Sequence, residues 1–578
     1  MNFSSEHRSV GIFVPLFALR SHDDLGVGDT ETLIDMIRWC RDQQLKVLQL
    51  LPINETSDDH SPYNAISSVA IEPSTLALSP ESVPGLIDAD LEEFLNDETR
   101  HQLSEGPVQY AKVKSLKRSL LERGFSRFVQ DQDSEIYREW QTFCQDENDW
   151  LMDYALFRIG MESHDGSPVW DDWSDHFKDR TSVETWLHSL AGDEGAGIRQ
   201  RVDFFQYLQW VAYRQWDRVR AIADECGVAL MGDIPFGLSR YSADVWADRE
   251  SFDLNWSGGA PPEPLFQDDA FVKHWGQNWG IPLYDWERMA ASNYAWWRRR
   301  VRMTVRIFRS FRIDHILGFY RIYAFPWPPQ QNHEFTDLSE EDVIERCGAL
   351  PQFLPQDDET AENKALNCEH GERLLTVLLD EAQEAVVIGE DLGVVPDYVR
   401  PNLEKLGISG FKIPVFERDE ATKEYRKPEN YPKLSLCTLS THDHLTMKGF
   451  WENWWSEFEQ AENHSEEGAA SQGEQSSWEL YRTQRFAQVS DEQLLRDYDS
   501  EVYPGILERF LGAQSWLAII NITDLLGLDL RFNVPGPVAD SNWSSRLPMP
   551  IRELSIVPDH QKRLRLFGDL MVSSGRTG

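Results

Sequence analysis

Three apolar segments of the chain end in clusters of ionisable side chains. The clusters are Arg312, Asp314 and His315 in FRIDHILGF, Glu390 and Asp391 in VVIGEDLG, and His442 and Asp443 in LCTLSTHDH. A carboxylate inside an apolar segment is costly unless it is paired or hydrogen-bonded. A single one of them could be a helix cap or a salt-bridge partner. Three clusters of this kind favour a functional site.

Glycosyl transfer is chemistry that uses two or three carboxylates without a metal cluster or a Ser or Cys nucleophile motif. A retaining enzyme needs one carboxylate as nucleophile and one carboxylic acid as general acid and then base. Arg312 has the same strand parity as Asp314, so its guanidinium can keep that carboxylate ionised. Glu390 lies beside Asp391, and this like charge is expected to raise its pKa.

Aromatic residues near these segments suggest a sugar ligand. Tyr63 lies in HSPYN and Trp279 in GQNWG, while Trp451, Trp454 and Trp455 follow Asp443. The apolar face of a sugar packs on an aromatic ring, and an indole N–H can also donate a hydrogen bond. Most of the 22 tryptophans are expected to serve packing, and Trp279 is the strongest candidate because glycines flank its motif.

The clusters must be positioned by the strands that precede them. Short apolar runs, separated mostly by helical patterns, predict eight buried parallel strands. They are Val10–Val14, Lys46–Leu51, Val228–Ile234, Phe311–Ile316, Ala385–Gly389, Phe411–Val415, Ser435–Leu439 and Leu517–Asn521. This alternation predicts an α/β fold, a (β/α)₈ TIM barrel, in which catalytic groups lie at the carboxyl ends of the strands.

Two stretches interrupt the alternation. Residues 57–201 form a largely helical insertion between the second and third strands, so we expect a barrel of residues 1–56 and 202–578 with an inserted subdomain. After the seventh strand, Ser456–Ser477 is rich in Glu, Gln, Ser and Gly and has no Lys or Arg. We expect a solvated loop there.

Composition excludes several classes of protein. With 97 acidic and 56 basic residues among 578, the net charge is −41, which would repel nucleic acid and anionic membranes. No apolar run is long enough for a transmembrane helix, and the N-terminus lacks the pattern of a signal peptide. The six cysteines are scattered without metal-ligand spacing, so we expect reduced thiols, no metal and a cytoplasmic protein.

The motifs RIDHILGF, GEDLGVVP and STHDH, in this order, resemble those of the 4-α-glucanotransferases (amylomaltase or disproportionating enzyme, glycoside hydrolase family 77). GDIPFG, SADVW, GAPP, GQNWGIPLYDW and NWSSRL agree with this, and the resemblance runs from about Gly11 to Arg546. RSHDDLGVGD and NYAWWRRR look most like the branch of the plant cytosolic disproportionating enzyme. That relative carries N-terminal starch-binding modules, which we do not expect here.

The resemblance implies a role for each motif residue. Asp314 would be the nucleophile, Glu390 the general acid and base, and Asp443 the stabiliser of the transition state. The residues implied to bind or position the sugar are Arg312, His315, Asp391, His442, Tyr63, Trp279 and Asn533. Maltooligosaccharides and starch-type or glycogen-type glucans would be the partners, with glucose as acceptor or product and no cofactor.

The sequence departs from the family pattern near the cleft, at Tyr241, Glu263 and His444, and the loop between Glu263 and Gly276 is extended. These departures bear on acceptor preference, and the long loop could act as a lid. Two alternatives to a transferase stay open: an α-glucan hydrolase of the α-amylase type and a glucan-binding protein without activity. The lack of Asp/Asn-rich calcium loops argues against the amylase.

Overall fold

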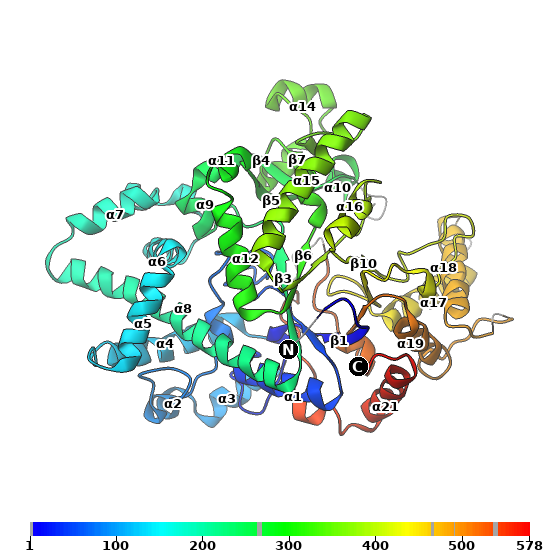
Figure 1. Cartoon of the computed structure of the whole chain (residues 1–578), viewed down its shortest axis with the longest axis horizontal. Helices are drawn as coiled ribbons and strands as arrows, with labels where there is room; N and C mark the ends of the chain where they lie inside the picture. Colours follow the sequence, from blue (N-terminus) through cyan, green and yellow to red (C-terminus); the bar gives the residue numbers. More distant parts are fainter. Residues whose placement is uncertain (1–3, 263–268, 464–466, 491, 536–540, 578) are drawn as a thin grey trace.

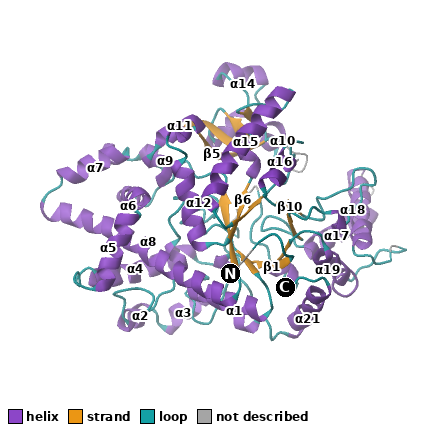
Figure 2. Cartoon of the chain, in the orientation of Figure 1, coloured by secondary structure: helices purple, strands orange, loops and turns teal. Residues whose placement is uncertain are grey.

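The computed structural model describes residues 4–262, 269–463, 467–490, 492–535 and 541–577. Eight parallel strands form one sheet in the order β10-β11-β12-β1-β2-β3-β6-β9 (Figures 1 and 2). Its edge strands meet where the Gly389 amide donates to the Ser409 carbonyl at 2.8 Å, next to a parallel bridge between Ile388 and Ser409. The sheet thereby closes into the predicted (β/α)₈ barrel.

All eight predicted strands are present. They are β1 (Ser9–Phe13), β2 (Val47–Gln49), β3 (Ala229–Pro235), β6 (Ser310–Asp314), β9 (Val386–Gly389), β10 (Gly410–Lys412), β11 (Ser435–Thr438) and β12 (Leu517–Asn521). Every residue of β2, β3, β11 and β12 is buried. Strands covered on both faces read as continuous apolar runs, and this is why the sequence revealed them.

Helices follow most barrel strands. The helices that pack with the barrel outside the two interruptions include α1 (Thr30–Asp42), α9 (Ala243–Ala247), α11 (Trp286–Ala291), α12 (Ala295–Ile307), α15 (Ala361–Ala382), α16 (Val399–Leu406), α19 (Tyr503–Gly512), α20 (Ile522–Leu526) and α21 (Pro558–Ser573). Asp29 begins α1 by accepting the amide of Thr32, as an N-cap does. One large apolar core joins the barrel and these helices.

The stretch between β2 and β3 is helical. Its helices are α2 (Asp88–Phe94), α3 (Asp97–Ser104), α4 (Tyr110–Phe128), α5 (Glu135–Asp146), α6 (Asn148–Ser163), α7 (Arg180–Ser189) and α8 (Gly192–Cys226). Helix α8 continues through residues 201 and 202 and ends at Gly227, whose φ of 68° suits a glycine C-cap. The inserted helices therefore share α8 with the barrel, and their description as a separate subdomain stays a prediction.

A second, antiparallel sheet that the sequence did not reveal lies at the top of Figure 1. It has the order β5-β4-β7-β8, with β4 (Phe252–Ala260), β5 (Gln277–Tyr284), β7 (Ile322–Phe325) and β8 (Gln352–Leu354). A small apolar cluster packs it against α10 (Ala270–Trp275), α13 (Asn332–Phe335) and α14 (Glu340–Cys347). Part of β4 and most of β5 are not fully buried, and glycines interrupt both strands, so they lack the long apolar run of a barrel strand.

The prediction of a loop at Ser456–Ser477 is wrong for the residues that the structure describes there. Helices α17 (Met447–Asn463) and α18 (Glu467–Phe486) form a hairpin there. The two helices approach so closely that a Cβ on Gly473 would lie 2.1 Å from the Cβ of Ala461. Glu, Gln and Ala favour a helix even on an exposed surface, so a polar composition alone does not predict a loop.

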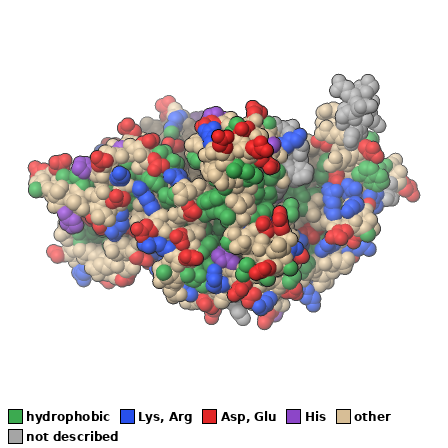
Figure 3. Space-filling view, turned by 90° about the horizontal axis from the view of Figure 1, so that it is seen from above, with side chains coloured by type: hydrophobic (Ala, Val, Ile, Leu, Met, Phe, Trp, Pro, Cys, Tyr) green, Lys and Arg blue, Asp and Glu red, His purple; other side chains and the backbone are tan. Residues whose placement is uncertain are grey.

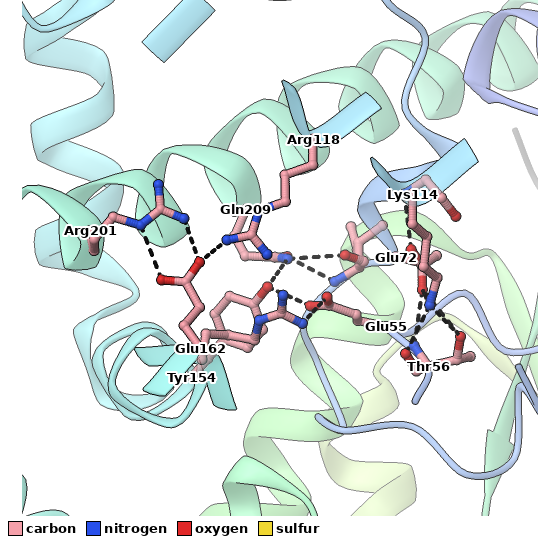
Figure 4. Close-up of polar contacts among 12 residues, drawn as sticks. Glu55, Thr56, Glu72, Lys114, Arg118, Tyr154, Glu162, Arg201 and Gln209 are labelled. Atoms are coloured by element: carbon pink, nitrogen blue, oxygen red, sulfur yellow. Dashed lines mark hydrogen bonds and ion pairs between the residues drawn. The ribbon is translucent and has the colours of Figure 1, made fainter. Parts of the chain in front are cut away.

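Ion pairs join the inserted helices to the chain after β2 (Figure 4). The buried carboxylate of Glu55 accepts hydrogen bonds from Arg158 and Tyr154, both on α6. Lys114, on α4, lies 3.3 Å from Glu72 and donates to the carbonyl of Thr56 at 3.0 Å. These contacts hold the segment that carries Tyr63.

Removing one partner of the buried Glu55–Arg158 pair should destabilise the fold. Arg158→Met leaves the Glu55 carboxylate without its counter-charge, which we expect to lower the free energy of unfolding by about 3 kcal/mol. The double variant Glu55→Gln/Arg158→Met should recover at least half of that loss, since it buries no unpaired charge. Urea unfolding of Arg158→Met, Glu55→Gln and the double variant measures this. A loss in the double variant equal to the sum of the two single losses would refute the interpretation.

Candidate active site

The centre of the site is a guanidinium shared by two carboxylates. Arg312 and Asp233 are register partners on the neighbouring strands β6 and β3. Arg312 donates from Nη1 to Asp233 Oδ2 and from Nη2 to Asp314 Oδ1, both at 2.6 Å. Arg312 and Asp233 are 6% and 7% exposed, so their ion pair is almost shielded from water, whereas the side chain of Asp314 is 30% exposed. The expected pairing of Arg312 with Asp314 is confirmed.

Sequence reasoning missed Asp233 as a site residue. It lies within β3, two residues before the strand ends, in the motif GDIPFG, and a carboxylate inside an apolar strand was the available signal. Its Oδ2 also accepts a hydrogen bond of 2.8 Å from the Tyr63 hydroxyl. Burial, together with the charge of Asp314, raises the pKa of Asp233 to about 6 against the opposing charge of Arg312.

Glu390 follows β9 and is held by backbone amides. Its carboxylate accepts hydrogen bonds from the amides of His315, at 2.9 Å, and Leu392, at 3.1 Å. His315 adopts a left-handed conformation (φ 49°) directly after Asp314, and this turn presents its amide to Glu390. The two carboxylates predicted to be nucleophile and acid are thus joined through adjacent residues of one turn.

The pKa of Glu390 is raised to about 7, as expected, but not by Asp391. Burial is the largest cause and the charge of Asp314 adds to it, while Arg312 and the two amides oppose the rise. Asp391 is 1% exposed and accepts hydrogen bonds from the Phe411 amide, at 2.6 Å, and from Arg400, at 2.8 Å. Its carboxylate therefore ties β9 to β10.

Asp443 is fixed by residues from two parts of the chain. Its Oδ2 lies 3.1 Å from Nε2 of His442, and its Oδ1 accepts a hydrogen bond of 2.6 Å from the Asn533 amide. Burial acts to raise the pKa of Asp443, but His442 and Asn533 outweigh burial and hold this pKa well below its usual range. The ring of His442 stacks on that of Tyr63, with centroids 5.2 Å apart and planes at 15°.

A cavity of about 410 Å³ opens beside Asp314 and His315. Tyr63, Phe236 and Trp279 supply aromatic walls, and Asp59 and Asn64 supply polar groups. Trp279, on β5, is 40% exposed and stands perpendicular to His315 at 4.8 Å, so the second sheet places its indole next to the carboxylates. The cavity combines apolar faces with hydrogen-bonding groups, as a sugar site requires.

The tryptophans on α17 serve packing. Trp451 is fully buried, and Trp455 donates its indole N–H to the Leu495 carbonyl at 3.2 Å. Trp454 stacks on Phe450, with ring centroids 5.5 Å apart. Packing therefore accounts for these three tryptophans, which the sequence had suggested as sugar-binding residues.

Two of the departures from the family pattern have defined contacts. The Tyr241 hydroxyl donates to Asp171 at 3.4 Å. His444 pairs its Nδ1 with the Thr441 hydroxyl at 2.7 Å and lies 4.9 Å from the ring of Phe416. Glu263 and the first part of the extended loop lie outside the described residues.

No group of three or more His, Cys, Asp or Glu side chains within the described ranges is placed to hold a metal ion. In the same part of the chain, no helix has the length and apolar character needed to cross a membrane.

Glu390 should cost the folded protein stability at neutral pH. Its folded pKa, about 7, exceeds the unfolded value of about 4.5, so the cost of ionising it in the fold grows as the pH rises from about 4.5 and is fully present above pH 7. Glu390→Gln removes this cost. Relative to the unaltered protein, the variant should gain about 2 kcal/mol of unfolding free energy between pH 5 and pH 8. Denaturation at both pH values measures this, and a pH-independent difference would contradict it.

The matches to known proteins extend over most of the chain. The family model described as 4-alpha-glucanotransferase (glycoside hydrolase family 77) matches residues 14–551. A 4-alpha-glucanotransferase of Chlamydia pneumoniae is 31% identical over 558 residues, 94% of this chain and 92% of that protein. One from Oryza sativa subsp. japonica is 26% identical over 715 residues, which cover 99% of this chain and 70% of the rice protein.

Solved structures agree on the fold. The amylomaltase from Corynebacterium glutamicum superposes with a TM-score of 0.75 at 21% identity, covering 97% of this chain and 75% of that one. The amylomaltase from Streptococcus agalactiae, in complex with acarbose, superposes with a TM-score of 0.71 at 21% identity. The match covers 98% of this chain and 99% of that one. The predicted resemblance is confirmed, and the chain belongs to the 4-alpha-glucanotransferases of glycoside hydrolase family 77.

Proposed function

We propose that the protein moves α-1,4-glucan segments from a donor maltooligosaccharide to the 4-hydroxyl of an acceptor glucose or glucan by retaining double displacement. The observation that carries this proposal is the arrangement around one turn. Arg312 holds Asp314 at 2.6 Å, and the amide of the next residue, His315, holds Glu390, whose pKa is about 7. A paired carboxylate and a carboxylic acid of raised pKa are the two groups that a retaining enzyme needs.

In the first step, Asp314 attacks the anomeric carbon of the donor and forms a glycosyl ester. Arg312 occupies Oδ1, so we assign the attack to Oδ2. Glu390 donates its proton to the glycosidic oxygen, and the shortened glucan leaves. In the second step, Glu390 takes the proton of the acceptor 4-hydroxyl, which attacks the same carbon and releases Asp314.

Asp443 is assigned to the sugar hydroxyls of the donor. His442 and Asn533 keep it ionised, so its charge is available when the sugar becomes oxocarbenium-like. Tyr63, Trp279 and His315 line the cavity in which the sugar would lie. Arg312 and Asp391 would act through the groups they hold: Arg312 orients Asp314, and Asp391 fixes the junction after Glu390.

A neutral polyhydroxy substrate suits the surface. Acidic and basic side chains are interspersed on the face in Figure 3, where apolar side chains show between them. A glucan needs no charge attraction, because hydrogen bonds and aromatic faces hold it. Glycogen or starch-type glucans are the proposed polymers, and the six free cysteines favour the reducing environment of the cytoplasm.

Maltotriose as sole substrate should distinguish transfer from hydrolysis. A transferase converts it to glucose and a ladder of longer maltooligosaccharides, since one sugar serves as donor and another as acceptor. Chromatography of the products over time measures this. Formation of shorter sugars alone would instead support the α-glucan hydrolase, and unchanged maltotriose would support the glucan-binding protein.

Asp314→Asn should lower kcat on maltotriose by about 10³-fold or more, because the amide cannot form the glycosyl ester. Asp171→Asn is a matched control, since Asp171 contacts Tyr241 and not the carboxylate cluster, and it should keep kcat within about threefold. Binding of acarbose measured by calorimetry shows whether the variant is folded. A variant that transfers glucose at the normal rate would overturn the assignment of Asp314.

A further inference from the structure

Helix α12 buries an arginine that the reaction scheme does not use. Arg300 is 4% exposed, and its guanidinium lies 5.4 and 5.3 Å from the rings of Trp296 and Trp297. The carboxylates that act on its charge are Asp244 and Asp233. Asp244 already accepts hydrogen bonds from Ser68 and Trp296. A buried cation needs a counter-charge. Both oxygens of Asp244 accept hydrogen bonds, whereas Asp233 keeps one oxygen without a partner among the described residues.

Arg300 and Asp233 border one small cavity, of about 30 Å³, beneath the carboxyl end of β3. We call it the β3 cavity; Ile71, Tyr213, Ile234 and Met303 are among its other walls. The polar groups of those walls have partners elsewhere: the Tyr213 hydroxyl donates to the Val69 carbonyl at 2.8 Å. The volume exceeds the roughly 10–15 Å³ that one water molecule requires.

Two buried polar atoms at this cavity have no partner among the residues that the structure describes. They are Oδ1 of Asp233 and Nη1 of Arg300. The other oxygen of Asp233, Oδ2, receives the hydrogen bonds of Arg312 and Tyr63. One atom is an acceptor and the other a donor, so a water molecule between them would satisfy both.

We propose that a buried water in the β3 cavity joins Arg300 to Asp233, and that Arg300 is a positioning residue for Asp314. The connection runs from Arg300 through the water to Asp233 Oδ1, and from Asp233 Oδ2 through Arg312 to Asp314. Arg300 also lies against the hydroxyl of Tyr284, which donates to the carbonyl of Phe236 at 2.5 Å. Helix α12 thereby supports the end of β3 at two points from outside the barrel.

The charge of Arg300 opposes protonation of Asp233. The groups that face Asp233 are Tyr63 after β2, Arg312 and Asp314 on β6, His442 after β11 and Arg300 on α12. Of the two arginines, Arg300 is the one that does not also bind the nucleophile. Without it, Asp233 would take up a proton at higher pH, and Arg312 would lose one of its two carboxylate partners.

The water itself is tested by a crystal structure of the unaltered protein at about 1.5 Å resolution. Density within hydrogen-bond distance of both Asp233 Oδ1 and Arg300 Nη1 is expected. A dry cavity would overturn the proposal. This test does not depend on the catalytic roles, so its failure and that of the proposed function are distinguishable.

The positioning role, which rests on the proposed role of Asp314, is tested with Arg300→Met, Arg300→Lys and the control Arg302→Met. Arg302 lies on the same helix, is 53% exposed and pairs with Asp149. For Arg300→Met we expect kcat to fall about tenfold with little change in KM, and the acid limb of kcat/KM to move up by about one pH unit.

Arg300→Lys keeps the charge and should restore the acid limb to within about 0.3 pH unit of the unaltered enzyme. If Arg300→Met moves this limb no more than Arg302→Met does, the positioning role is wrong. If Arg300→Met does not fold, the comparison of Arg300→Lys with the unaltered enzyme decides. The proposal then predicts that the acid limb of kcat/KM in Arg300→Lys lies at the same pH as in the unaltered enzyme. A shift of that limb by about one pH unit contradicts the proposal.

Discussion

The site depends on one buried guanidinium. Asp233 and Arg312 are register partners on adjacent parallel strands, and Asp314 follows Arg312 by two residues, so all three side chains are directed to the same face of the barrel wall. Two carboxylates this close, one of them buried, would repel each other if Arg312 did not lie between them. The ion pairs keep Asp314 oriented, and burial, to which the charge of Asp314 adds, raises the pKa of Glu390 to about 7. The position of this single cation therefore sets the geometry of Asp233 and Asp314, the two carboxylates that it binds.

Elements outside the barrel complete the site. Tyr63 comes from the chain after β2, which the inserted helices hold through Glu55 and Lys114. Trp279 comes from the antiparallel sheet, and Asn533 from the segment after α20. Arg312, Asp314 and Glu390 stand on or directly after barrel strands, and Asp443 lies in the loop that follows β11. The barrel therefore positions the reacting groups, while the added elements shape the sugar site.

The sequence allowed the barrel and the charged clusters to be predicted, because buried parallel strands read as apolar runs and a charge at their ends is conspicuous. Parity alone paired Arg312 with Asp314. The antiparallel sheet escaped prediction because glycines and polar residues interrupt its strands and its four strands are spread over about 100 residues. The α17–α18 hairpin escaped it because the segment is polar. The cause of the raised pKa of Glu390 also required the fold, since Asp391 is adjacent in sequence but turned toward Phe411, whereas Asp314 is distant in sequence and acts on Glu390.

The central claim is that Asp314, oriented by Arg312, forms the covalent bond to the sugar. It is tested most directly by incubating the Glu390→Gln variant with α-maltotriosyl fluoride, whose fluoride leaves without acid assistance, and by mapping the labelled peptide by mass spectrometry. The account predicts a maltotriosyl ester on Asp314, because the variant can form the intermediate but lacks the base for its transfer. A label on Asp233 or Asp443, or rapid turnover with no label, would contradict it.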